Sequence, residues 1–114
     1  MGIEHLFAGI PVADRDAAAA WYELLLGRPP DLLPSETEAA WQLTESGWIY
    51  LLADAERAGS ALHTLLVDDL DAFIARIAAR GISAGPIETI AGGVRHVVLT
   101  DPDGNRLNIG RPPG

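Results

Sequence analysis

The sequence predicts an α+β fold made of two βαβββ modules, and three observations support this. A strand-to-helix junction of the form V-x-D-x-D-A occurs at residues 12–17 and again 55 residues later, at 67–72. Each junction leads into a run of helix-forming residues and then two or three short strands. The chain closes on a tight turn, Asp101-Pro102-Asp103-Gly104-Asn105, between two strand-like segments. Because half of this chain cannot bury a sheet face alone, we expect the two modules to cover each other and form a cup.

The first module spans about residues 3–54. A short acidic residue, Asp14 or Asp16, is expected to cap the helix at its start, and Gly27 occupies the place of a C-cap glycine. Pro29 and Pro30 prevent the helix from continuing. The predicted elements are a strand over 3–12, a helix over 17–26, a loop over 28–38, and strands over 39–43 and 48–53.

The second module spans about residues 60–110 and repeats this order. Asp69 is the predicted N-cap of its helix and Gly81 the predicted C-cap. The predicted elements are strands over 62–67 and 87–90, a helix over 70–80, a Gly92-Gly93 turn, and a hairpin of strands 94–99 and 106–109. In this alignment of the modules Gly47 takes the place of Gly104.

Composition restricts the classes of protein to which the chain can belong. A length of 114 residues, 48% of them apolar, indicates one domain, residues 1–114. A net charge of −8 argues against nucleic acid as a partner and would suit a cationic small ligand. Even the longest apolar runs, such as Trp48 to Ala53, are too short to cross a membrane. With no cysteine and no signal-peptide pattern, we expect a cytoplasmic protein without thiolate chemistry.

The repeated junction together with the "DPDGN" turn resembles the vicinal oxygen chelate superfamily over about residues 3–110. This superfamily includes glyoxalase I, extradiol dioxygenases, fosfomycin-resistance transferases and bleomycin-resistance proteins. The resemblance implies a glyoxalase/bleomycin-resistance-like fold, in which paired βαβββ modules hold a small-molecule pocket in a cup of mixed sheets. It also implies a homodimer.

The resemblance places a divalent metal ion on four strand positions, and here none of them carries a metal ligand. Counting from the junctions and the turns assigns these positions to Phe7, Leu51, Leu62 and Asn108. Such side chains do not hold a hard or borderline cation, so we expect neither a metal nor another cofactor. His63 cannot replace Leu62 as a ligand, because neighbouring residues of a strand face opposite sides of the sheet. The main alternative is a β-bulge in the first strand that brings His5 to the position of Phe7.

The same register assigns the side chains that face the cup. They are apolar and aromatic with a few polar groups, as is usual for a small-molecule site. Trp48 and Tyr50 alternate with these positions and are expected on the helix side or at a subunit interface, and Trp21 and Tyr22 in the core or an interface. The predicted pocket residues are Phe7, Gly9, Trp41, Ile49, Leu51, Leu62, Thr64, His96, Val98, Arg106 and Asn108.

Three functions fit these expectations. The preferred one is a metal-free binding protein that sequesters a bulky ligand, similar to bleomycin-resistance proteins. The second is an enzyme of the lyase, isomerase or dioxygenase kind, using a rescued metal or using His96 as general base with Arg106 polarising an oxyanion. The third is a subunit or sensor whose pocket is closed by apolar side chains.

Overall fold

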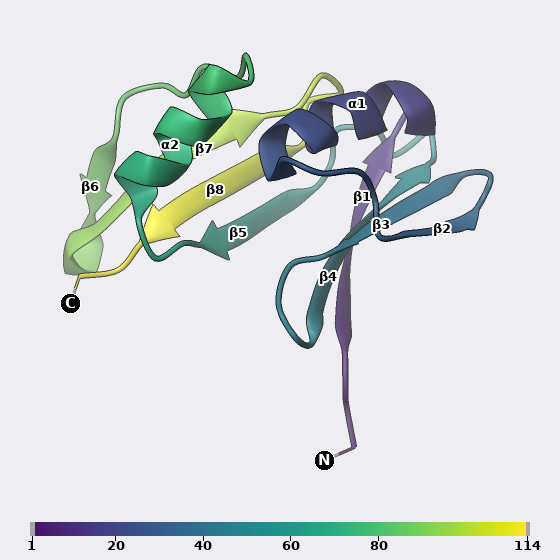
Figure 1. Ribbon diagram of the computed structural model, residues 1–114, viewed down its shortest axis with the longest axis horizontal. Coiled ribbons are helices and arrows are strands. Elements are labelled where there is room, and N and C mark those ends of the chain that lie inside the picture. Colours follow the sequence, from purple (N-terminus) through teal and green to yellow (C-terminus); the bar gives the residue numbers. More distant parts are fainter. Residues whose placement is uncertain (1, 114) are drawn as a thin grey trace.

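The computed structural model describes residues 2–113 and consists of two consecutive βαβββ modules (Figure 1). The described part of the chain contains no helix long and apolar enough to cross a membrane. The first module comprises β1 (Leu6–Val12), α1 (Arg15–Leu26), β2 (Leu32–Ser35), β3 (Glu38–Gln42) and β4 (Gly47–Ala53). The second comprises β5 (Leu62–Leu66), α2 (Leu70–Ala79), β6 (Glu88–Ile90), the short 3₁₀ turn η1 (Ala91–Gly93), β7 (Val94–Thr100) and β8 (Arg106–Arg111).

Each module forms a four-stranded mixed sheet, and the two sheets have the same order. The orders are β1-β4-β3-β2 and β5-β8-β7-β6. In both, the first strand runs parallel to the last, and the remaining neighbours are antiparallel. The predicted α+β fold of paired βαβββ modules is therefore confirmed. Strand β2 lies inside the segment that was predicted to be a loop, so this part of the prediction is wrong. The four residues of β2 are all exposed, and such a strand leaves no periodic pattern in the sequence.

The helix starts follow the repeated junction. Asp14 is the N-cap of α1 and accepts hydrogen bonds from the backbone N–H groups of Asp16 and Ala17, while Asp69 caps α2 by accepting one from the backbone N–H of Ala72. Gly27 ends α1 in the left-handed region at φ 77°, as predicted. The end of α2 differs from the prediction by one residue: its cap is Arg80, and the left-handed Gly81 follows.

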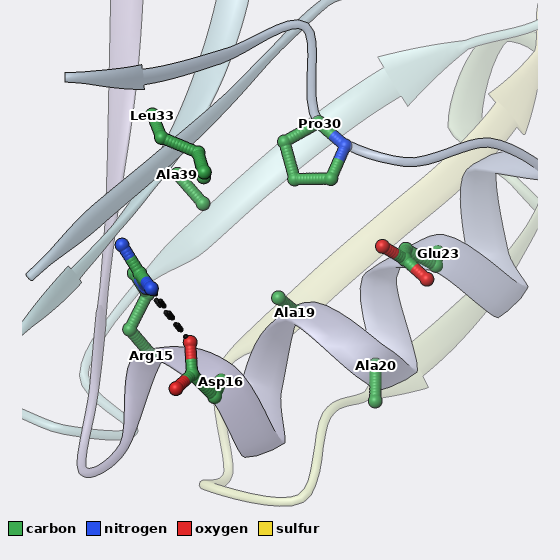
Figure 2. A pocket seen from close by; sticks show the side chains of 8 residues that line it. All are labelled: Arg15, Asp16, Ala19, Ala20, Glu23, Pro30, Leu33 and Ala39. Atoms are coloured by element: carbon green, nitrogen blue, oxygen red, sulfur yellow. Dashed lines mark hydrogen bonds and ion pairs between the residues drawn. The ribbon is translucent and has the colours of Figure 1, made fainter. Parts of the chain in front are cut away.

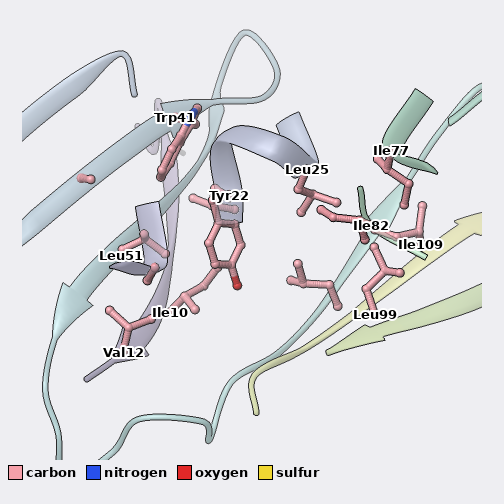
Figure 3. Close-up of a cluster of buried hydrophobic side chains, with 14 of the residues drawn as sticks. Ile10, Val12, Tyr22, Leu25, Trp41, Leu51, Ile77, Ile82, Leu99 and Ile109 are labelled. Atoms are coloured by element: carbon pink, nitrogen blue, oxygen red, sulfur yellow. The ribbon is translucent and has the colours of Figure 1, made fainter. Parts of the chain in front are cut away.

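Both modules contribute to one hydrophobic core on the sides of the sheets that face the helices (Figure 3). Ile10, Leu25 and Leu51 from the first module and Ile77 and Ile109 from the second are fully buried in it. Tyr22 is buried there as well, as predicted. We call this side of each sheet the helix face and the opposite side the open face.

The "DPDGN" turn fastens the second module to the first. Asn105 donates from Nδ2 to the carbonyl oxygen of Pro11, and Asp103 accepts from the backbone N–H of Ala13. Asp101 accepts a hydrogen bond from the hydroxyl of Tyr22 at 2.8 Å. The neighbouring edge strands β1 and β5 meet near this end, where His63 Nε2 is hydrogen-bonded to the carbonyl oxygen of Gly9. Away from this junction the two sheets diverge (Figure 1).

Candidate functional site

The open face of the first module carries a group of three aromatic side chains, which we call the aromatic platform. Phe7 on β1 stacks on Trp48 of β4, with ring centroids 5.1 Å apart and planes 15° from parallel. Tyr50, two residues further along β4, meets Phe7 edge-on at 6.4 Å. The strand pairing of Phe7 with Trp48 and of Gly9 with Tyr50 places these rings on one face. Phe7 remains 47% exposed, so a ligand has access to its ring.

Two predicted pocket residues on this sheet, Trp41 and Leu51, lie instead on the helix face. Both are fully buried, and Trp41 packs against Tyr22 and donates its indole N–H to the carbonyl oxygen of Arg28. Ile49, also predicted to face the cup, is buried in the core. Trp48 and Tyr50, predicted on the helix side or at a subunit interface, do not lie on the helix side but occupy the open face.

A shift of one residue between the modules explains this exchange. Gln42 pairs with Trp48 as Thr100 pairs with Arg106, so β3 and β4 correspond to β7 and β8 with an offset of 58 residues. Ser46, and not Gly47, therefore takes the place of Gly104, which has a positive φ of 101°. Because side chains alternate along a strand, a shift of one residue moves every side chain to the other face.

A different sequence signal would have given the correct register. An offset of 58 aligns the buried apolar residues of the two hairpins with one another, whereas matching the glycines does not. The aligned pairs are Ala39 with Val97, Trp41 with Leu99, Ile49 with Leu107, and Leu51 with Ile109.

The open face of the second module is more polar. Thr64 of β5 pairs with Asn108 of β8, and Asn108 donates from Nδ2 to the Thr64 hydroxyl at 3.4 Å. Leu62 pairs with Arg106, and both are exposed. Val98, 44% exposed, pairs with Asn108 from the other side. The predicted residues of this module, together with Phe7 and Gly9, therefore lie on the open faces.

His96 and Arg106 do not lie next to each other on this face. The partner of His96 on β8 is Gly110, four residues beyond Arg106. At the rise of an extended strand this separation is about 13 Å along the sheet. His96 instead pairs with Glu88 of β6, and both line a hollow of about 140 Å³. The backbones of His96 and Arg106 are therefore well separated on this face.

The positions that the superfamily uses for its metal ion carry no imidazole or carboxylate in this chain. With the register corrected, they are Phe7, Tyr50, Leu62 and Asn108. Strand β1 pairs with β4 without a register shift, and His5 precedes the strand, so no bulge brings His5 into this set. Among residues 2–113 no three His, Cys, Asp or Glu side chains gather closely enough to hold a metal ion.

Hollows also lie between the two modules, where Trp48 and Thr64 belong to the lining, and beside α1. A groove of about 600 Å³ runs between the diverging modules and is lined mainly by apolar residues, including Ala8, Leu26, Leu65 and Phe73. A smaller hollow of about 260 Å³ lies between α1 and the segment that carries Pro30 and Leu33 (Figure 2).

Two polar side chains of the smaller hollow, Arg15 and Asp16, already have structural partners. Arg15 forms an ion pair with Asp16 at 2.8 Å and donates to the carbonyl oxygen of Ser35 at 2.9 Å. These contacts attach α1 to strand β2.

Comparison with known proteins agrees with this architecture. The glyoxalase-like domain model matches residues 8–110. A glyoxalase/bleomycin resistance protein from Catenulispora acidiphila DSM 44928 is 48% identical, with a TM-score of 0.89 over 96% of this chain and 98% of that chain.

More distant structures share the fold. A bleomycin-binding protein complexed with bleomycin is 22% identical, with a TM-score of 0.75 over 96% of this chain and 98% of that one. A lactoylglutathione lyase from Agrobacterium tumefaciens is 20% identical, with a TM-score of 0.75 over 93% and 91% of the two chains. No curated protein matches the sequence. The chain belongs to the glyoxalase-like domain family of the vicinal oxygen chelate superfamily.

Proposed function

We propose that this protein is a metal-free small-molecule binding protein that sequesters a planar ligand on its aromatic platform. The observation that carries the proposal is the stack of Phe7 on Trp48 beside Tyr50, exposed on an open face of the sheet. Aromatic rings bind planar ligands by stacking and bind cations through their π faces. A net charge of −8 also favours a cationic ligand at long range.

The side chains at the superfamily's four metal positions support a binding function without a metal ion. A phenyl ring, a phenol, an aliphatic chain and an amide stand where imidazole or carboxylate ligands would be needed. A bleomycin-binding relative with the same fold holds a small molecule. Sequestration of a drug-like compound is therefore the activity that we propose, in a cytoplasmic protein.

We further propose that the protein works as a homodimer. Strands β1 and β5 each end a sheet and have one edge without a strand partner in the described chain. Apolar side chains gather along these strands: Leu6 is 70% exposed, Leu62 56% and Leu66 65%. Exposed strand edges with apolar side chains favour pairing with another chain, and a second copy would cover them.

The proposal is tested by metal analysis and by binding of ethidium, a planar aromatic cation. We expect the purified protein to hold no stoichiometric metal, and its Tm to be unchanged by EDTA, Ni²⁺, Zn²⁺ or Mn²⁺. Ethidium should bind, and Phe7→Ala should weaken binding about threefold to tenfold by removing a stacking partner. Leu33→Ala, on the exposed strand β2, is the control and should leave the affinity unchanged.

Two results would contradict the proposal. A metal ion that raises the Tm by several degrees would restore the metalloenzyme alternative. Equal affinities of ethidium for the wild type and for Phe7→Ala would place the ligand elsewhere.

A further inference from the structure

The Tyr50 ring lies across strand β1, and the absence of a side chain at Gly9 makes this arrangement possible. A Cβ atom at Gly9 would lie 3.1 Å from both Cζ and the hydroxyl oxygen of Tyr50. Gly9 does not have a positive φ, so the backbone there would accept any residue. Glycine is therefore needed at this position for space and not for conformation.

The corresponding pair in the second module shows the same complementarity with different groups. Thr64 stands at the place of Gly9, and Asn108 at the place of Tyr50. In the second module the first strand carries Thr64, which is larger than glycine, and the last strand carries Asn108, which is smaller than tyrosine. These two side chains are hydrogen-bonded to each other. In the first module a missing side chain accompanies a large ring. The pair Gly9 and Tyr50 thus determines the shape of the open face of the first module.

This arrangement places a phenolic hydroxyl over β1, beside the stacked rings of Phe7 and Trp48. The Tyr50 hydroxyl makes no hydrogen bond to another residue in the described part of the chain. By contrast, the buried Tyr22 donates its hydroxyl to Asp101. A free O–H next to an aromatic surface is suited to a ligand that combines a flat ring with a hydrogen-bond acceptor.

We infer that Gly9 and Tyr50 together provide the polar contact of the ligand site and select planar aromatic ligands that carry a hydrogen-bond acceptor at the ring edge. Tyr50 contacts the ligand directly, and Gly9 is a positioning residue that gives the Tyr50 ring its place. The inference rests on the proposed binding function of the aromatic platform.

The test compares isoquinoline with naphthalene, which have nearly the same shape but differ by one ring nitrogen that accepts a hydrogen bond. Their affinities are measured by NMR titration at pH 7.5, following the backbone N–H of Gly9 and the indole N–H of Trp48. The wild type should bind isoquinoline about threefold to tenfold more tightly than naphthalene, the usual range for one hydrogen bond. Tyr50→Phe should bind both probes with the affinity of the wild type for naphthalene.

Variants of Gly9 test the positioning role. Gly9→Val should abolish the preference for isoquinoline, and the same change in a Tyr50→Ala background should have no further effect on the ratio of affinities. Gly85→Val is the control and should keep the preference, since a Cβ at Gly85 meets no atom within 4 Å. The ratio of two affinities is insensitive to a general loss of folded protein.

The outcomes separate this inference from the proposed function. If both probes shift the platform resonances with equal affinity in the wild type, or if Tyr50→Phe keeps the preference, the inference is wrong and the platform remains a binding site. If neither probe affects these resonances, the proposed function fails and the inference fails with it.

Discussion

Asp101 is a buried residue that links the turn at 101–105 to the first module. The residue is 4% exposed, and its two carboxylate oxygens accept four hydrogen bonds. The donors are the Tyr22 hydroxyl, the backbone N–H groups of Asp103 and Asn105, and the Asn105 side-chain amide. A buried carboxylate needs such partners, because each unpaired polar group costs about 1–3 kcal/mol. The first Asp of the turn therefore has a structural role that its turn-forming propensity does not reveal.

The hydrogen bond between Tyr22 and Asp101 makes the free energy of unfolding depend on pH. Burial, followed by the nearby charge of Asp101 and the hydrogen bond to it, raises the pKa of Tyr22 above its ordinary value. Below pH 10 the phenol is neutral in both the folded and the unfolded chain, and its contribution is fully present. As the pH rises further, the unfolded chain loses this proton while the folded chain retains it, so the free energy of unfolding falls.

We predict that Tyr22→Phe is less stable than the wild type by about 2 kcal/mol at pH 8, because a buried hydrogen bond to a carboxylate is lost. This difference should shrink as the pH rises above 10. Urea denaturation of both proteins between pH 8 and pH 11 measures it. A difference that stays constant over this range would show that Tyr22 does not retain its proton in the folded protein.

Strand β4 is the element that decides where the site lies. Its residues alternate between the core, with Ile49 and Leu51 buried, and the open face, with Trp48 and Tyr50 partly exposed. Alternation was readable from the sequence, but which set faces the core was not, because both sets are apolar or aromatic. In β8, by contrast, Arg106 and Asn108 alternate with apolar residues, and their faces were predicted correctly.

The element boundaries show the same difference between strong and weak sequence patterns. Helix caps with a direct physical cause, such as Asp14, Gly27 and Asp69, were predictable, as was the closing hairpin. Strand β2 was missed, because its Leu-Leu-Pro-Ser sequence contains a proline and lies on an exposed edge. Trp48 and Tyr50 were missed as site residues because of the one-residue shift between the hairpins.

We predict that neighbouring leucines of β4 respond differently to truncation. Leu51→Ala should lower the free energy of unfolding by about 2–5 kcal/mol, since Leu51 is fully buried in the core. Leu52→Ala, on the open face and only partly buried, should cost about 1 kcal/mol. Urea denaturation gives both values. If Leu52→Ala is the more destabilising change, the assignment of the faces of β4 is wrong.

On the scale of the whole molecule, the modules are joined at one end and separate at the other. The turn at 101–105 and the contact of His63 with Gly9 hold the joined end. Arg80, at the end of α2, donates from Nη2 to the carbonyl oxygen of Leu25 near the end of α1. The shared core and these contacts hold the open faces in a defined relation, while within residues 2–113 β1 and β5 each keep one edge without a strand partner.

We expect a dimer, because β1 and β5 each have one edge without a strand partner in the described chain. Sedimentation velocity should show a dimer for the wild type, and Leu66→Asp should yield monomers because it places a charge among exposed apolar side chains of the edge. Leu33→Asp, at a leucine of similar exposure on β2, is the matched control and should remain dimeric. A monomeric wild type at micromolar concentration would contradict the proposed dimer.

Mapping ethidium binding on ¹⁵N-labelled protein in the presence of EDTA shows whether the aromatic platform binds a ligand without a metal ion. We expect the largest shifts at Phe7, Trp48 and Tyr50, and an unchanged affinity when EDTA is replaced with Zn²⁺. Binding that requires the metal ion, or shifts confined to the groove around Leu26 and Phe73, would contradict this expectation.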